Sequence, residues 1–238
     1  MLEVAYKNQQ GFLPSSFSIL DILVTLYYEV MEKEDQFVLS KGHAAFGLYV
    51  VLEDKGILER DELDTFGQYQ SRLSLMAERG VPGVLFSTGS LGHGLPEAVG
   101  MAYGNRMKKK NNRIFVIIGD GELNEGTNWE ALLAASKLGL DHVICILDNN
   151  HTTEKGIDLA DLRGKFEAFN WHVEEVDGHD ERELINVLNQ SYDVPFMVIA
   201  DTIKGKGCDS FEQQAGLWHS KAPNEEEYKM LLQELNTK

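Results

Sequence analysis

Two short apolar runs dominate the pattern of hydrophobic and polar positions along the chain. Residues 114–118 and 143–147 are almost entirely aliphatic or aromatic, and each run breaks abruptly into small and oxygen-bearing residues. Apolar runs of this length are typical of strands buried on both faces, as in a parallel sheet covered by helices. Residues 127–140 between them carry apolar side chains at helical spacing. The pattern therefore predicts a strand–helix–strand crossover unit.

The same alternation continues through the rest of the chain. Further strands are predicted at 36–39, 172–176 and 195–200. Helices are predicted at 19–30 behind an N-cap at Ser18, at 44–52, 60–66 and 159–169, after a cap at Asp180, and at 224–235. Residues 11–18 and 68–83 are expected to be loops. We predict an α/β fold, a doubly wound, mostly parallel sheet with helices on both faces, in a single domain spanning residues 1–238.

Composition narrows the class of protein. The chain has 238 residues and a formal charge of −16, which argues against nucleic acid and anionic membranes as partners. The basic cluster at 108–110 is explained by a solvated helix end. Its two cysteines form no disulfide framework, and no signal peptide or membrane-length apolar run is present. We expect a cytoplasmic enzyme subunit.

The polar residues that follow the two apolar runs suggest a metal-dependent phosphate site. Asp120 lies between Gly119 and Gly121, where a backbone without side chains can approach a phosphate closely. Asn150 follows the second run and offers an amide oxygen. Because the carboxyl ends of parallel strands meet at one sheet edge, these groups should face a common ligand. Such hard oxygen donors, completed by diphosphate and water, suit Mg²⁺ or Ca²⁺.

Two other segments are candidates for the same edge. His43 follows the strand at 36–39, although a structural histidine at a helix start explains it equally well. Residues 87–94 are rich in glycine and precede a helix of small residues, a pattern that exposes amide donors to an anion but also occurs in ordinary helix-start loops.

Taken together, these segments resemble the thiamine-diphosphate enzymes, and specifically the N-terminal, diphosphate-binding subunit of a split transketolase. The resemblance covers nearly the whole chain. It is carried by six stretches in order: Ser-Lys-Gly-His at 40–43, residues 87–92, residues 119–130 with Gly-Asp-Gly, Asp-Asn-Asn at 148–150, Lys-Gly-Lys-Gly at 204–207, and residues 218–224.

The resemblance implies roles for individual residues. It implies that Asp120, Asn150 and the backbone carbonyl of Thr152 bind the metal. The residues expected at the cofactor are His43, Gly89, Ser90, Leu91, Gly119, Asp120, Gly121, Glu122, Asn150, Thr152 and His219. Those expected to take part in catalysis are His43, His93, His219, Glu125 and Glu130. The two glutamates match residues that lie between the cofactors of a dimer, although acids favoured by a helix start are an alternative.

The resemblance also implies that part of the machinery lies elsewhere. In this family a glutamate on a following pyrimidine-binding domain activates thiamine diphosphate, and this sequence contains no such domain. We therefore expect activity only with a separate C-terminal transketolase subunit, as a heterotetramer with two copies of each.

Departures from the family pattern leave the substrate open. Phe12 stands where transketolases carry a sugar-contacting histidine, residues 77–83 lack the usual Gly-His-Pro nearby, and His93 replaces a glutamine. One hypothesis is transfer of a two-carbon ketol unit from a ketose to an aldehyde. A second is a carboligase or decarboxylating synthase that uses a 2-oxo acid, and a third is a cofactor-binding module without catalysis.

Overall fold

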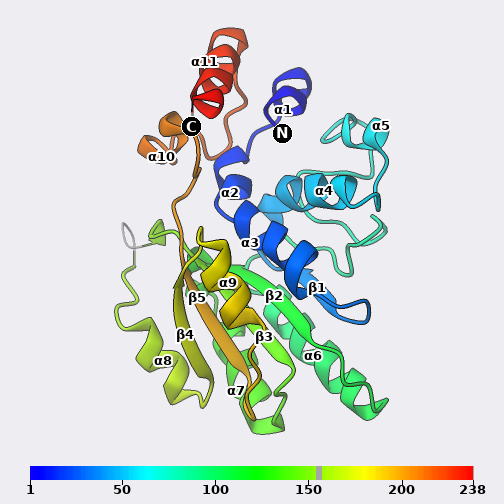
Figure 1. Ribbon diagram of the computed structural model, residues 1–238, viewed down its shortest axis with the longest axis vertical. Helices are drawn as coiled ribbons and strands as arrows, with labels where there is room; N and C mark the ends of the chain where they lie inside the picture. The colour runs from blue at the N-terminus through cyan, green and yellow to red at the C-terminus, as the bar shows by residue number, and fades with distance from the viewer. Residues whose placement is uncertain (154–156, 238) are drawn as a thin grey trace.

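A five-stranded parallel sheet forms the centre of the molecule (Figure 1). The computed structural model describes residues 1–153 and 157–237. The strands are β1 (Gln36–Leu39), β2 (Ile114–Gly119), β3 (Val143–Asn149), β4 (His172–Asp177) and β5 (Phe196–Asp201). They lie in the order β1-β2-β3-β5-β4, and every neighbouring pair is parallel. The predicted α/β class and all five predicted strands are confirmed.

The helices alternate with these strands as the apolar spacing predicts. The α-helices are α1 (Leu2–Asn8), α2 (Leu13–Phe17), α3 (Leu20–Thr25), α4 (Ala45–Asp54), α5 (Arg60–Leu63), α6 (Gly94–Met107), α7 (Gly126–Leu138), α8 (Leu162–Ala168), α9 (Glu181–Leu188), α10 (Asp209–Gln213) and α11 (Glu225–Asn236). A π-helical turn, η1 (Leu26–Val30), continues α3, and two 3₁₀ turns, η2 (Gly42–Ala44) and η3 (Asp120–Asn124), follow β1 and β2.

Each face of the sheet carries its own hydrophobic core. Alternate residues of a strand point to opposite faces, so Phe115 and Ile117 pack with α3, α4 and α9 on one side. Val116 and Ile118 pack with α6, α7 and α8 on the other. Because both faces are covered, the strands are apolar along nearly their whole length, which explains the continuous runs in the sequence.

The strand order explains why α9 lies apart from α6, α7 and α8. From β1 to β4 the chain moves in one direction across the sheet, and right-handed crossovers keep α6, α7 and α8, the helices that lead into β2, β3 and β4, on one face. The step from β4 to β5 goes back toward β3, so the same handedness places α9 on the opposite face. Figure 1 shows α9 in front of the strands and α6 and α7 behind them.

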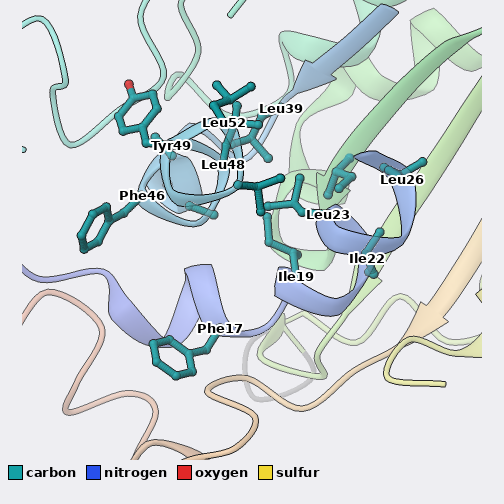
Figure 2. Packing of buried hydrophobic residues seen from close by; sticks show 14 of the residues in the cluster. Phe17, Ile19, Ile22, Leu23, Leu26, Leu39, Phe46, Leu48, Tyr49 and Leu52 are labelled. Atoms are coloured by element: carbon teal, nitrogen blue, oxygen red, sulfur yellow. The ribbon is translucent and has the colours of Figure 1, made fainter. Parts of the chain in front are cut away.

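Helices α3 and α4 pack closely near β1 (Figure 2). Ile19 and Leu23 point toward Leu48 and its neighbours on α4, and the labelled aliphatic side chains are all buried. Burying a side chain of this size contributes about 1.5–3 kcal/mol to the free energy of unfolding. This packing holds α2, and the loop before it, against the carboxyl edge of the sheet.

Two predictions about residues 11–30 are wrong. Ser18 does not cap a helix; its hydroxyl donates a hydrogen bond of 2.7 Å to Asp148 Oδ1. The predicted loop at 11–18 contains α2, because Pro14 occupies the first turn, where a missing amide hydrogen costs nothing. The short helix α10 was also not predicted. In the described part of the chain no helix is both long and apolar enough to cross a membrane.

Candidate functional site

A cleft of about 300 Å³ opens at the carboxyl edge of the sheet. It is lined by Phe12, Lys41, His43, Met76, Gly89, Leu91, Gly119, Asp120, Gly121, Glu122, Asn150, Thr152, Thr153, Lys204 and His219. These residues come from the segments after β1, β2, β3 and β5 and from the loop before α2. Of the residues predicted to contact a cofactor, all but Ser90 line this cleft. Ser90 is exposed.

The ends of β2 and β3 present Asp120 and Asn150 to the cleft. Asp120 starts η3; its Oδ1 accepts a hydrogen bond of 2.8 Å from the Gly121 amide, and its Oδ2 accepts one of 3.1 Å from the Thr153 amide. Asn150 lies just beyond β3, and its Oδ1 accepts a hydrogen bond from the Thr152 hydroxyl. The arrangement supplies carboxylate, amide and backbone oxygens at one opening, the donor chemistry that a hard divalent cation prefers.

Glu122 fixes the backbone around this opening. Its side chain is buried; Oε1 accepts hydrogen bonds from Ser40 Oγ at 2.7 Å and the Gly92 amide at 2.9 Å, and Oε2 accepts one of 2.9 Å from the Gly119 amide. Burial raises the pKa of Glu122, although these donors oppose the shift. The residue was predicted to contact the cofactor. In the structure its hydrogen bonds connect the three segments that contain Ser40, Gly92 and Gly119.

Gly89 and Gly42 allow two of these segments to approach closely. Gly89 has a φ of 134°, which residues with a Cβ rarely adopt, and a Cβ on Gly42 would lie 2.5 Å from the Thr88 carbonyl. The backbone at 88–92 therefore packs directly against the turn after β1. This packing places the glycine-rich loop beside Asp120, as the resemblance implies.

Two lysines line the cleft. Lys41 is 2% exposed and pairs with the fully buried carboxylate of Asp148, which neutralises its charge. Burial would raise the pKa of Asp148, but the Lys41 ammonium and the hydroxyls of Thr202 and Ser18 outweigh it and lower that pKa. Burial, together with the nearby Lys41, lowers the pKa of Lys204. Lys204 therefore supplies the positive charge that suits the cleft to an anionic ligand.

An aromatic cluster of Phe12, His43 and His219 forms another part of the wall. The Phe12 ring centroid lies 5.3 Å from that of His219 and 6.0 Å from that of His43, and the two imidazoles are 5.7 Å apart. The Phe12 amide donates a 3.1 Å hydrogen bond to the His219 carbonyl. The segments before α2 and after α10 therefore meet at this wall.

Both imidazoles in the cluster are neutral near pH 7. Burial, reinforced by Lys41 and Lys204, lowers the pKa of His43 to about 3. Burial and the same lysines lower the pKa of His219. A neutral imidazole can accept a proton from a hydroxyl or donate a hydrogen bond to one, and the cationic lysines favour that neutral form.

The other three residues predicted to be catalytic lie away from the cleft. His93 and Glu125 occupy the N-cap positions of α6 and α7 without a side-chain capping hydrogen bond, and Glu130 lies on α7; all three are exposed. These residues lie at or near the N-terminal ends of α6 and α7, and their side chains are on the sides of these helices that face solvent. Their predicted roles remain predictions about an assembly and not about this cleft.

Some cleft residues were missed by the sequence analysis. Lys41 and Lys204 lie within stretches that carried the resemblance, and each is followed directly by a glycine. That pattern could have indicated that both lysines lie at the cleft. Met76 comes from the loop at 68–83, and nothing in its local pattern marks it. Asp148 gave no signal of its role because its partners Ser18 and Thr202 are distant in sequence.

The fold and the cleft define the class of protein: an α/β protein that binds its ligand at the carboxyl edge of a parallel sheet. Residues 24–237 match the model of the family described as "Transketolase, thiamine diphosphate binding domain". The chain belongs to this family, as the resemblance in its sequence suggested.

Relatives and solved structures agree with this assignment. The chain is 35% identical to an apulose-4-phosphate transketolase subunit of Phocaeicola vulgatus, over 99% of this chain and 90% of that protein. It is 36% identical to the 6-deoxy-6-sulfo-D-fructose transketolase subunit SqwG of a Clostridium species, over 98% and 91%. Transketolase from Leishmania mexicana superposes with a TM-score of 0.84 at 26% identity, covering 99% of this chain but 39% of that one.

Proposed function

We propose that the chain is the diphosphate-binding subunit of a split transketolase, which moves a two-carbon ketol unit from a ketose-type donor to an aldehyde acceptor with thiamine diphosphate and Mg²⁺. The observation that carries this proposal is the meeting of Asp120, Asn150 and the glycine-rich loop at one cleft. These are the groups that a metal-tethered diphosphate requires.

The donor set fits a divalent cation. Asp120 Oδ2, Asn150 Oδ1 and the Thr152 carbonyl would hold Mg²⁺, or Ca²⁺, with the remaining positions left to diphosphate and water oxygens. Within the described residues no three His, Cys, Asp or Glu side chains form a metal site. A single protein carboxylate is consistent with an ion whose other anionic ligands come from the cofactor.

The chain's own residues then divide the work. Lys204 would attract the diphosphate, and the amides of residues 89–91 would surround it. His43 and His219, neutral near pH 7, would accept and return protons at substrate hydroxyls. Thiamine diphosphate supplies, when bound, the electron sink that permits cleavage of a carbon–carbon bond next to a carbonyl.

Activity is proposed to require a partner. The relatives from Phocaeicola vulgatus and Actinobacillus succinogenes are both named as transketolase subunits, and this chain spans about two fifths of the Leishmania mexicana transketolase. We infer that a separate C-terminal subunit supplies the glutamate that activates the cofactor, in a heterotetramer with two copies of each. The test is ketol transfer by the chain alone and by the chain coexpressed with that partner, at saturating thiamine diphosphate and Mg²⁺. Turnover by the chain alone would contradict the proposal.

A second candidate function is favoured by Phe12. An aromatic ring between His43 and His219 cannot hydrogen-bond a donor hydroxyl, so a less hydroxylated donor such as pyruvate suits this wall. A donor screen of the reconstituted pair separates the two functions. Release of carbon dioxide from pyruvate, without ketol transfer from ketose phosphates, would establish the decarboxylating synthase.

A further inference from the structure

Asp148 is a fully buried carboxylate that connects four segments around the cleft. It lies in β3, two residues before Asn150, and is 0% exposed. Its Oδ1 accepts hydrogen bonds from the hydroxyls of Ser18 and Thr202. Its Oδ2 accepts hydrogen bonds from Lys41 Nζ and, at 2.8 Å, from Asn150 Nδ2. A carboxylate offers about four acceptor positions, so these donors satisfy it.

This carboxylate determines which way the Asn150 amide points. Both oxygens of Asp148 accept hydrogen bonds from their neighbours, and the nitrogen of the Asn150 amide faces Oδ2 at 2.8 Å. If the amide were reversed, the Asn150 oxygen would face Asp148 Oδ2 in a buried site. Two acceptors without a donor between them would then be desolvated without a hydrogen bond, which is unfavourable. The Asn150 oxygen is therefore directed away from Asp148, where the Thr152 hydroxyl meets it and the cleft begins.

Lys41 helps to hold the Asp148 carboxylate in place. Its ammonium is buried against the carboxylate and shares Oδ2 with Asn150. The carboxylate therefore has a fixed position from which it contacts the Asn150 amide at the cleft wall.

We propose that Asp148 is a positioning residue that directs the Asn150 oxygen toward a divalent cation in the cleft. The inference rests on the proposed function, because the cation is the one that would tether the diphosphate. Residues behind metal ligands that fix ligand orientation commonly change metal affinity about 10- to 100-fold when they are removed.

The test uses the chain coexpressed with its proposed C-terminal partner and follows Mn²⁺ binding by electron paramagnetic resonance in the presence of thiamine diphosphate. Removing either Lys41 or Asp148 alone would leave a buried charge without a partner and risk unfolding. The variant is therefore K41M/D148L, in which an apolar pair of similar size replaces the ion pair, and its reference is the wild-type protein. We expect K41M/D148L to bind Mn²⁺ at least tenfold more weakly than the wild type.

Two further variants separate positioning from general stabilisation. Thr202→Val removes a donor from Oδ1 but leaves the Asn150 contact, so Mn²⁺ affinity should stay within threefold of wild type. In an N150A background, adding K41M/D148L should change the affinity less than threefold, because the residue through which Asp148 acts is gone.

The outcomes are distinct. Equal Mn²⁺ affinity of the wild type and K41M/D148L, or the same loss in the N150A background, would overturn the positioning role while leaving the proposed function intact. Failure of the wild-type pair of subunits to bind Mn²⁺ with thiamine diphosphate would overturn the proposed function and this inference together.

Discussion

Phe12 combines an unusual backbone conformation with a central place in the cleft. Its φ of 61° lies in the left-handed region, which side chains with a Cβ enter at a cost. The conformation lets its amide reach the His219 carbonyl and turns its ring toward both imidazoles. A strained residue kept at a ligand-facing wall is a candidate for a functional role.

We predict that Phe12→His shifts donor preference toward hydroxylated ketoses. A histidine at this position can hydrogen-bond a donor hydroxyl, and sites built to do so discriminate strongly against donors without one. In the reconstituted pair, the ratio of kcat/KM for a ketose phosphate to that for pyruvate should rise at least tenfold. Phe12→Leu, which keeps an apolar wall, is the control and should change the ratio less than threefold. An unchanged ratio in Phe12→His would show that Phe12 only packs.

His43 makes the free energy of unfolding depend on pH. The folded chain keeps His43 neutral down to about pH 3, whereas the unfolded chain protonates it below about pH 6.5. Protons therefore bind the unfolded state preferentially, and stability is lost as pH falls from about 6.5 toward 3. Between pH 6 and 4 the slope from this group approaches about 1.4 kcal/mol per pH unit.

Urea unfolding of the chain without cofactor at several pH values measures this slope. We expect His43→Gln to remove most of it, because glutamine does not titrate. A similar loss of stability with falling pH in both proteins would assign the effect to other groups.

At the scale of residues, the polar residues at the strand ends could be predicted, but the buried residues that hold them in place could not. Asp120 and Asn150 each follow an apolar run that forms a strand. Because these strands are parallel, both residues lie at the same edge of the sheet. Lys41, Asp148 and Thr202 form a network only after three strands align, and a sequence carries no local trace of such an alignment.

At the scale of elements, predictions succeeded where burial on both faces controlled the pattern. All five strands and the long helices α4, α7 and α11 were found. The N-terminal segment was harder, because α3 changes into the π-helical turn η1 and α2 has five residues, too short for a helical period to show. Tertiary packing against α4, and not local propensity, maintains such short elements.

Helix α11 offers a direct test of a predicted helix start. Asn224 Oδ1 accepts a 3.0 Å hydrogen bond from the Glu227 amide, and Glu227 Oε2 accepts one of 3.0 Å from the Asn224 amide. This reciprocal pair is a capping box. Asn224→Ala should lower the free energy of unfolding by about 1 kcal/mol.

The matched control for this variant is Asn224→Asp, which keeps an acceptor at the same position. Its free energy of unfolding, measured in urea, should stay within about 0.5 kcal/mol of wild type. Equal losses in both variants would mean that α11 is maintained by its packing on α1 and not by its cap.

At the scale of the whole molecule, the two covered faces leave the sheet edge as the place for a ligand. The layers followed from the alternation of strands and helices, whereas the cleft's width and polarity depended on loops that contribute Met76 and Thr153. Loop conformations follow from packing against the finished sheet, so their contribution could not be derived from periodicity.

We predict that thiamine diphosphate and Mg²⁺ stabilise the molecule only together. A ligand present at about 100 times its Kd raises the free energy of unfolding by about 2.7 kcal/mol, which a thermal-shift measurement detects. Adding EDTA to the chain with both ligands should abolish the shift, because in the proposed site the cation would link the diphosphate to Asp120 and Asn150.

The control is Asp120→Ala, which lacks the carboxylate and should show no rise in Tm with both ligands. A full rise in the presence of EDTA would mean that the diphosphate is held by Lys204 without a metal.

The hydrogen bond between Phe12 and His219 also makes the cleft wall depend on residues beyond the sheet. The last strand, β5, ends at Asp201, whereas the carbonyl that accepts the Phe12 hydrogen bond belongs to His219. A chain shortened after residue 201 would therefore keep every strand of the sheet but lose this contact at the cleft wall.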